Sequence, residues 1–401
     1  MGSSRTKEAH MSGSWIVAGA RTPIGKLSGA FAAMSAADLG AIAIADALRR
    51  AGVEPDRVDH VVMGQVLGAG QGQVPARQAA ARAGIPMRTP SVNVNKVCLS
   101  GLNAIHLAHL MIAAGDADVV VAGGMESMTN APYLLPGARG GMRYGNAEVQ
   151  DAIVRDGLWC AFDACLMGLG TERYSAGSIS REDQDAFSAR SHARAVAATD
   201  RLAEEIVPVP VPQRKGEPVL VARDEGVRAD ATTASLAGLR PAFDPKGTIT
   251  AGNASQISDG GAALVVASDR AVRELGLSPM GRIAGYGMVA GPDTPSLLLQ
   301  PALAIRAAIA RAGVGLGDLG VVEINEAFAA VGIASTRELG LDEEIVNPNG
   351  GAIAVGHPIG MSGARLALTL LHELRRRGAR LGAAALCGGG GQGDALVVEA
   401  A

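Results

Sequence analysis

Two cysteines and one histidine lie in glycine-rich segments where a thiol and an imidazole could cooperate in nucleophilic catalysis. Cys98 lies in NKVCLSGLNAIHLA, His357 in AVGHPIGMSGAR and Cys387 in LCGGGGQGDA. Cys98 is predicted to stand where a strand gives way to a helix, and the positive end of that helix would favour a thiolate. A buried cysteine that only packs is the alternative for Cys98. We expect all three side chains at the carboxyl ends of strands, the usual place for active sites in α/β proteins.

Other groups could assist these three residues. Asn325 in VVEINEAFAAV ends an apolar run, where its amide could hydrogen-bond a water or a carbonyl, although asparagine there is also a common turn former. The glycine run 388–391 could aim backbone N–H groups at a developing oxyanion. Cys160 and Cys165 have no further ligand nearby at zinc spacing, so we expect them to pack and predict no metal site.

The elements that must position these groups are repeated along the chain. Residues 41–53 (AIAIADALRRAGV) align with residues 302–314 (ALAIRAAIARAGV), and both are predicted to be amphipathic helices that stop at Ala-Gly-Val. An apolar strand is predicted after each helix, at 58–63 and at 319–324. These matches indicate two related halves.

A second pair of matches extends the repeat. VNVN at 92–95 and VNPN at 346–349 each precede a turn of small residues, then a helix, an apolar strand and more glycines. Alternating helices and apolar strands of this length predict an α/β fold with buried sheets. We expect two halves packed about a pseudo-twofold axis, with the site where they meet.

The repeat also suggests the domain boundaries. We predict an N-terminal half at 12–127 plus 258–279, an inserted loop domain at 128–257 and a C-terminal half at 280–401. The insertion contains valine-proline steps at 207–212 and has no repeat partner. It could cover a ligand or serve as an arm for oligomer formation, and both interpretations stay open.

Composition excludes several classes of function. The 36 basic and 39 acidic residues give a net charge of −3, which is unlike a nucleic-acid-binding protein, and a content of 48% hydrophobic residues is unlike a disordered chain. The glycine-rich segments lack the lysine of a phosphate-binding P-loop and the context of a dinucleotide site. Four scattered cysteines, no long uninterrupted apolar span and no secretory pattern in residues 1–10 lead us to expect a cytoplasmic protein without a membrane segment.

Taken together, NKVCLSG, NEAF, GHPIGMSGAR and CGGGGQGDA resemble the thiolase family, and GGMESM and TITAGNASQISDGGAA extend the resemblance over about residues 16–399. The resemblance implies a duplicated αβαβα layered core with an inserted loop domain. It also implies an acyl-CoA:acetyl-CoA C-acyltransferase, most specifically an acetyl-CoA C-acetyltransferase. The partners would be acetyl-CoA, acyl-CoA and 3-ketoacyl-CoA, with no cofactor besides these coenzyme A thioesters.

The resemblance also implies roles for the residues already named. Cys98 would be the nucleophile that carries the acyl group, and His357 would be the base that accepts its proton. Cys387 would exchange the proton on the α-carbon of acetyl-CoA. His357 and a water held by Asn325 would stabilise the enolate, while the N–H groups of Cys98 and Gly389 would hold the acyl-enzyme oxyanion.

For coenzyme A, the resemblance implies contacts on the loop domain. Arg228 would lie near the adenine, although a solvated surface arginine is the alternative, and Ser255 would contact the pantetheine. The remaining contacts and tunnel walls would be Leu158, Met167, Ser235, Phe243 and Phe328. Leu166 stands where short-chain members of the family commonly have histidine, which leaves the acyl chain length open. The family further implies a homodimer or homotetramer, with residues 131–144 as the tetramer contact.

Four alternatives remain to be compared with this interpretation. A medium- or long-chain degradative 3-ketoacyl-CoA thiolase would use the same residues. A β-ketoacyl synthase would carry a second histidine in place of Cys387 or Asn325, and a cysteine peptidase built on Cys98, His357 and Asn325 would leave Cys387 unexplained. A non-catalytic acyl-CoA-binding protein would have lost at least one of the chemical residues.

Overall fold

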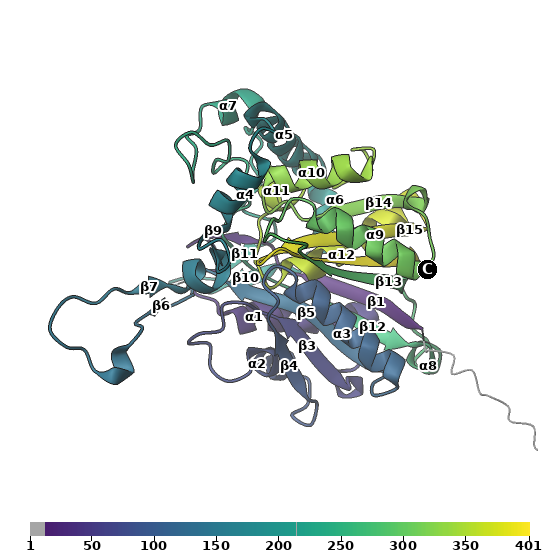
Figure 1. Ribbon diagram of the computed structural model, residues 1–401. Coiled ribbons are helices and arrows are strands. Elements are labelled where there is room, and N and C mark those ends of the chain that lie inside the picture. The colour runs from purple at the N-terminus through teal and green to yellow at the C-terminus, as the bar shows by residue number, and fades with distance from the viewer. Residues whose placement is uncertain (1–12, 214) are drawn as a thin grey trace, which may run out of the picture.

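The computed structural model describes residues 13–213 and 215–401, so the expectation for residues 1–10 lies outside the described part of the chain. Helices and strands alternate through both halves, and the insertion lies between them (Figure 1). The elements of the N-terminal half are β1 (Ser14–Arg21), β2 (Gly25–Lys26), α1 (Ala36–Ala51), η1 (Pro55–Arg57), β3 (His60–Gly64), α2 (Pro75–Arg82), β4 (Ser91–Val94), α3 (Ser100–Ala114), β5 (Val119–Ser127), β12 (Ser258–Ser268) and α8 (Asp269–Glu274). Those of the C-terminal half are β13 (Gly281–Ala290), α9 (Gln300–Ala312), η4 (Leu316–Asp318), β14 (Leu319–Ile324), α10 (Ala329–Leu339), α11 (Ala352–Val355), α12 (Ser362–Arg377), β15 (Leu381–Gly388) and β16 (Gln392–Ala400).

The strands of both halves form one mixed, ten-stranded sheet in the order β14-β15-β16-β13-β1-β12-β5-β3-β4, with β2 paired to β12. Strand β3 runs parallel to β4 and β5, and β14 runs parallel to β15, while the other pairings are antiparallel. The two halves join where β1 pairs with β13, at Trp15 opposite Arg282 and Ile16 opposite Gly281.

The N-terminal and C-terminal parts of this sheet form two strand layers, with one layer of helices between them and one on each outer face. Helices α3 and α12 pack against each other in the middle, where Leu102, Ile105, Leu366 and Leu370 belong to one buried core. Helices α1 and α2 cover the outer face of the N-terminal half, and α9 covers the outer face of the C-terminal half. The predicted αβαβα architecture is confirmed.

Strand β5 shows why the strands appear in the sequence as continuous apolar runs. Val120 and Ala122 face the middle core, whereas Val119 and Val121 face the outer core under α1. A strand covered on both faces buries consecutive side chains instead of alternating ones.

The predicted repeat is also present in three dimensions. Helices α1 and α9 both end at a glycine in the left-handed conformation, Gly52 with φ 64° and Gly313 with φ 68°. A side chain would be strained at these positions, which accounts for the repeated Ala-Gly-Val stop. The parallel pairing of Val62 with Val92 in one half matches that of Val322 with Val346 in the other.

Glycines allow the two halves to approach closely near the middle helices. A Cβ atom on Gly124 of β5 would overlap the backbone of Gly360, and one on Gly363 would overlap Leu102 of α3. Backbone-to-backbone contact of this kind tolerates no side chain. The glycine-rich segments around Cys98 and His357 therefore also serve the contact between the halves.

Residues 128–257 leave the sheet after β5 and return to it at β12. Part of this insertion forms an arm that extends away from the body between β6 and β7 (Figure 1). The valine-proline steps form β10, which pairs with β11. The elements of the insertion are β6 (Tyr133–Leu134), η2 (Ala138–Gly140), β7 (Gln150–Asp151), η3 (Ile153–Leu158), β8 (Trp159–Cys160), β9 (Cys165–Leu166), α4 (Met167–Ser175), α5 (Arg181–Ala197), α6 (Thr199–Ala203), β10 (Val209–Val211), β11 (Val219–Val221) and α7 (Thr233–Ala237).

One segment, Val97–Ala114, is long and apolar enough to cross a membrane by length and composition. It contains α3, which packs in the middle layer against α12 and the strands β3 and β5. The core position of α3 is sufficient to explain the apolar composition of this segment.

Candidate active site

His357 lies between two helices, because Ala352–Val355 folds into the short helix α11 and Ser362 begins α12. The expectation that His357 follows a strand is therefore wrong. Its backbone N–H donates to the carbonyl of Gln256 at 3.3 Å and to Ser258 Oγ at 3.2 Å, which ties this segment to the return strand β12. The side chain is buried, with 6% of its surface exposed.

Hydrogen bonds determine which nitrogen of His357 carries the proton. The Ser362 hydroxyl donates to the carbonyl of Pro358 at 2.9 Å, so it must accept from Nδ1–H of His357 at 2.6 Å. Nε2 then carries the lone pair and accepts from the Asn325 amide at 3.3 Å. The imidazole therefore presents an unprotonated nitrogen to the site.

The environment also keeps this imidazole uncharged. Burial lowers the pKa of His357 to about 3, and the charge of Arg365 adds to the shift. Neutral histidine at physiological pH is able to accept a proton, which is the state that a general base requires.

Cys98 lies two residues before α3, after Val97 in a left-handed conformation with φ 51°. The backbone N–H groups of Cys98 itself and of Gly389 act on the sulfur and lower the pKa of the thiol. Burial nevertheless raises the pKa of the Cys98 thiol to about 12, and the charge of Glu126 contributes to the rise. The sequence-based prediction of a ready thiolate is wrong for this site, because the loss of solvation outweighs the stabilisation from the helix end.

Cys387 lies inside β15, near its carboxyl end, and 1% of its surface is exposed. Burial raises the pKa of this thiol, and the proximity of Cys98 raises it further. The structure thus brings the two predicted thiols from opposite halves together. The glycine run after Cys387 makes the turn from β15 to β16, with Gly390 and Gly391 at positive φ, and this turn delivers the Gly389 N–H to Cys98.

Asn325 directly follows β14, and its backbone N–H donates to Ala385 of the neighbouring strand at 2.9 Å. Its side-chain amide reaches His357, whereas its buried Oδ1 has no hydrogen-bond partner among the described residues. A buried carbonyl oxygen without a partner is costly unless it binds a donor, which makes this oxygen suited to hold a water or a substrate group.

A cavity of about 570 Å³ opens onto His357. Five of the seven residues predicted to contact coenzyme A line it, namely Leu158, Met167, Phe243, Ser255 and Phe328. Phe243 and Phe328 meet edge to face, with ring centroids 6.2 Å apart. Walls of this apolar character suit an acyl chain and a pantetheine arm.

The other two predicted contacts, Arg228 and Ser235, are not among the residues that line this cavity. Both are exposed on the loop domain. The backbone N–H of Arg228 donates to His192 at 3.2 Å, and Ser235 forms the capping box of α7 with Thr232. Leu166 does line the cavity, as expected from its position beside Met167.

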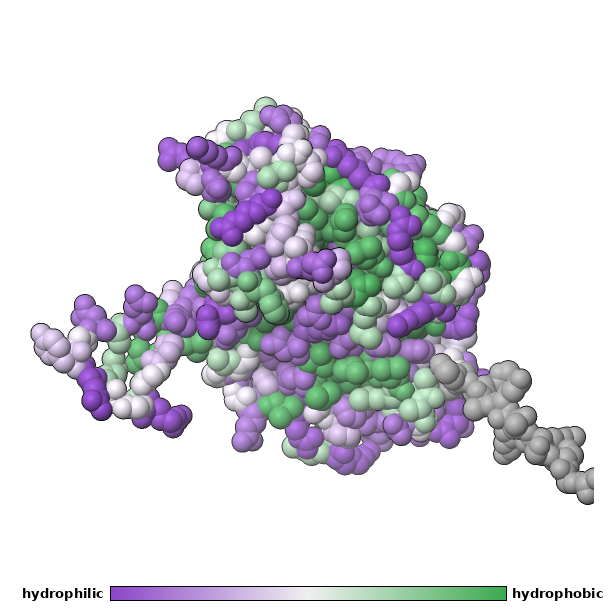
Figure 2. Space-filling model, in the orientation of Figure 1, coloured by the Kyte–Doolittle hydropathy of each residue, from purple (hydrophilic) through white to green (hydrophobic). Residues whose placement is uncertain are grey.

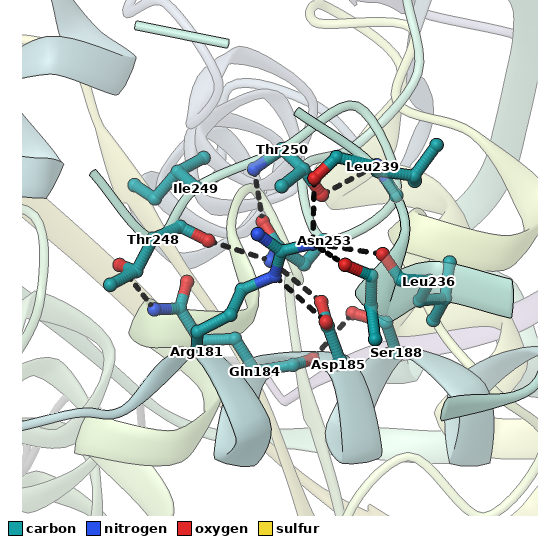
Figure 3. A network of polar contacts seen from close by, with 12 residues as sticks. Arg181, Gln184, Asp185, Ser188, Leu236, Leu239, Thr248, Ile249, Thr250 and Asn253 are labelled. Atoms are coloured by element: carbon teal, nitrogen blue, oxygen red, sulfur yellow. Dashed lines mark hydrogen bonds and ion pairs between the residues drawn. The ribbon is translucent and has the colours of Figure 1, made fainter. Parts of the chain in front are cut away.

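One wall of the cavity is held by a buried polar network (Figure 3). Asn253 donates to Asp185 at 3.1 Å and to the carbonyl of Thr248 at 3.1 Å, and its Oδ1 accepts from the Thr250 N–H at 2.7 Å. Arg181 in turn binds the second oxygen of Asp185 at 2.7 Å. These bonds shape the segment that places Ser255 at the cavity.

The family description "Thiolase, N-terminal domain" matches residues 14–270, and "Thiolase, C-terminal domain" matches residues 277–400. The chain belongs to the thiolase family.

Relatives of this thiolase chain cover almost its full length. It is 56% identical over 387 residues to the probable acetyl-CoA acetyltransferase of Mycolicibacterium smegmatis, covering 96% of this chain and 100% of the relative. It is 51% identical to the acetyl-CoA acetyltransferase of Cupriavidus necator, over 96% of this chain and 98% of the relative. The crystal structure of the Bacillus anthracis acetyl-CoA acetyltransferase superposes with a TM-score of 0.94 at 40% identity, covering 98% of this chain and 99% of that one.

Sequence reasoning missed several residues that hold this thiolase site together. Ser362 sets the tautomer of His357, Asn253 shapes the cavity wall, and Glu126 binds backbone groups from both halves. A serine at the start of a predicted helix, five residues after His357, was an available signal for the first of these. The other two could not be found without long-range contacts.

Proposed function

We propose that this protein is an acetyl-CoA C-acetyltransferase that joins two acetyl-CoA molecules, or cleaves acetoacetyl-CoA with coenzyme A, through an acyl-enzyme on Cys98. The observation that carries the proposal is the arrangement of two buried thiols and a neutral imidazole whose Nε2 holds a lone pair. The similarity to proteins named acetyl-CoA acetyltransferase supports it.

In the first half-reaction, His357 Nε2 accepts the thiol proton of Cys98 as the sulfur attacks the thioester carbonyl. The N–H groups of Cys98 and Gly389, which act on the sulfur in the resting site, would stabilise the oxyanion. The bond to coenzyme A then breaks, and its sulfur takes a proton from Cys387. Acetylated Cys98 and a Cys387 thiolate remain.

In the second half-reaction, the Cys387 thiolate removes the α-proton of a second acetyl-CoA. The enolate is stabilised by protonated His357 and by a water held by Asn325, whose buried Oδ1 is otherwise without a partner in the described chain. The enolate carbon attacks the acetyl carbonyl, the bond to Cys98 breaks, and His357 returns its proton to Cys98. Two thiols are required because one is acylated while the other transfers a proton at carbon.

The proposal is tested by thiolysis of 3-ketoacyl-CoA substrates of four to sixteen carbons, followed by the ultraviolet absorbance of the substrate. We expect the largest kcat/KM on acetoacetyl-CoA. Absence of activity on every substrate, together with failure of acetyl-CoA to label Cys98, would favour a non-catalytic acyl-CoA-binding protein instead.

A medium- or long-chain degradative thiolase is the second candidate, because a specific observation favours it. Leu166 adds an alkyl side chain to a cavity already lined by Leu158 and Met167. Each additional methylene buried in such a pocket is worth up to about 1–3 kcal/mol, so longer chains would gain affinity here. A kcat/KM that rises with chain length would replace the acetoacetyl-CoA assignment and place the enzyme in β-oxidation.

We also propose a homotetramer assembled through the arm at residues 131–144. Tyr133, Met142 and Tyr144 are exposed on this arm, which extends from the body and carries apolar patches among polar ones (Figure 2). Exposed apolar side chains on a projecting segment are suited to a contact with a second copy. Light scattering should show a tetramer for the full chain and a dimer when the arm is replaced by a short glycine linker.

We propose that Arg228 and Ser235 contact the nucleotide end of coenzyme A outside the cavity, so that Arg228→Ala raises KM for coenzyme A. The chemistry needs only thiols, an imidazole and backbone N–H groups, so activity should survive dialysis against EDTA. We propose the cytoplasm as the place of action, which fractionation of the source cells would test.

A further inference from the structure

Glu126 is a buried carboxylate near the end of β5 that the mechanism above does not use. None of its surface is exposed. Oε2 accepts the N–H groups of Val66 at 2.9 Å and Gly360 at 3.0 Å, and Oε1 accepts the N–H of Leu67 at 3.1 Å. Three backbone donors on one buried carboxylate form a firm anchor, because each is charge-assisted.

These three donors come from the two different halves of the molecule. Val66 and Leu67 follow β3 and belong to the same small core as Cys98 and Ile359. Gly360 lies in the segment between His357 and its partner Ser362, and among the described residues Glu126 is the hydrogen-bond acceptor of its N–H. The carboxylate therefore joins the segment that carries the base to the segment beside the nucleophile.

The charge of Glu126 also acts on the site. Burial raises the pKa of Glu126 to about 7, with the buried Asp259 of β12 adding to the rise. Ionised Glu126 in turn raises the pKa of Cys98. The other titratable group on the Gly360 segment is His357, which is neutral, so Asp259 and Cys98 are the groups whose ionisation couples to Glu126.

We propose that Glu126 is a positioning residue whose carboxylate holds the His357 segment against the Cys98 segment, and whose negative charge makes Cys98 less reactive above neutral pH. The part concerning Cys98 reactivity is independent of the proposed acyltransferase function. The part concerning turnover rests on that function.

The charge effect is tested by the rate at which iodoacetamide alkylates Cys98 in the full-length protein from pH 5.5 to 9, measured by mass spectrometry of the Cys98 peptide. Above pH 7 we expect Glu126→Gln to react roughly 3- to 10-fold faster than the unmodified chain, the range expected of one unit charge in a partly screened interior. At pH 5.5 the two rates should converge, because Glu126 is then protonated and uncharged.

Two further variants separate charge from shape. Glu126→Asp keeps the charge and should retain the slow alkylation at high pH. Glu172→Gln is the matched control, since Glu172 is a buried carboxylate that also accepts backbone N–H groups, from Thr248 and Ile249, but lies in the loop domain. In Glu172→Gln the rate of Cys98 alkylation should depend on pH as it does in the unmodified protein. The same rate ratio at every pH in Glu126→Gln, or fast alkylation of Glu126→Asp, would overturn the charge effect.

If Glu126→Gln fails to fold, the unmodified protein still provides a test, because its own alkylation rate should rise less steeply across pH 7 than on either side. A constant slope through pH 7 would contradict the proposal.

Turnover tests the positioning role. In Glu126→Gln we expect kcat for acetoacetyl-CoA thiolysis to fall about tenfold or more, with KM for coenzyme A changed less than about twofold, because the lost bond orients the base and leaves the cavity walls in place. A raised KM with unchanged kcat would show that Glu126 does not position the base. If the unmodified protein has no acyltransferase activity, the proposed function fails while the alkylation results still decide the charge effect.

Discussion

The starts of helices α3 and α12 are equivalent places in the two halves, yet they carry different chemistry. Cys98 lies two residues before α3 begins, and His357 lies five residues before α12 begins. Each helix begins with a serine, but Ser100 binds the backbone of Lys96 and Val97, whereas Ser362 binds the imidazole of His357. The duplicated framework therefore brings two helix starts together, and local side chains decide which supplies a nucleophile and which a base.

Burial shifts the pKa values of Cys98 and His357 in opposite directions, but both shifts favour the uncharged form. It raises the pKa of Cys98 to about 12 and lowers that of His357 to about 3, so both groups rest uncharged. A resting thiolate and imidazolium pair, as a cysteine peptidase would use, is disfavoured in this environment. The thiol must lose its proton as it attacks, which makes the exact placement of the base important.

The largest predicted effect is a loss of acetylation that distinguishes the role of Cys98 from that of Cys387. Cys98→Ala should abolish transfer of a labelled acetyl group from acetyl-CoA, because no nucleophile remains, with a loss of at least about 10³-fold. Cys387→Ser should still become acetylated and should fail in carbon-carbon bond formation. Acetylation followed by mass spectrometry measures the first step, and thiolysis of acetoacetyl-CoA measures the second. Equal loss of acetylation in both variants would contradict the assignment.

The second prediction compares the two helix-start serines. Ser362→Ala removes the acceptor for His357 Nδ1–H, so the imidazole loses its fixed tautomer and orientation, and kcat should fall on the order of 100-fold. Ser100→Ala is the matched control, because among the described residues its hydroxyl bonds to backbone groups only. This variant should have a lower melting temperature and a nearly unchanged kcat. If both variants have the same kcat, Ser362 does not orient His357 for catalysis.

The third prediction uses acid to distinguish the buried base from the buried thiol. In the unfolded state residue 357 binds a proton as pH falls below its ordinary pKa of about 6.5, whereas the folded state with its lowered pKa does not. The unfolded state therefore binds more protons, and the free energy of unfolding decreases as the pH is lowered through this range. Between pH 6.5 and 4.5 the free energy of unfolding should fall by about 2 kcal/mol more in the unmodified protein than in His357→Gln.

Urea unfolding at the two pH values measures this difference. Cys98→Ala is the comparison, because a thiol is uncharged in both states over this range and its removal should leave the pH dependence unchanged. An identical pH dependence in His357→Gln and the unmodified chain would show that the imidazole is not held neutral by the fold.

The smallest predicted effect lies in the loop domain, outside the duplicated halves. Asn253→Ala removes the amide that shapes residues 248–255. KM for coenzyme A should rise about 3–10-fold while kcat changes little, because the ground state and the transition state lose the same amount of binding free energy. Steady-state thiolysis with varied coenzyme A measures both constants. A fall in kcat alone would mean that this network supports the reacting groups instead.

Much of the fold could be predicted from the sequence because apolar periodicity and helix stops are local signals. The second predicted strand, residues 319–324, coincides with β14, and the predicted helix at 302–314 differs from α9 by two residues at each end. Local signals also misled in one place, since the apolar residues before His357 fold into α11 instead of a strand. Four residues are too few for a periodic pattern to distinguish the two.

The site could be predicted only in part. The amino-acid sequence was enough to identify the chemically capable groups and to assign them to two related halves, because residue types and repeats can be read along the chain. Folding in three dimensions places the Gly389 N–H at the sulfur of Cys98, sets Ser362 and Asn325 to orient His357, and lets Glu126 join the two segments. It also decided the charge states of Cys98 and His357. Those depend on burial and on contacts between residues far apart in sequence, and neither is present until the two halves pack against each other.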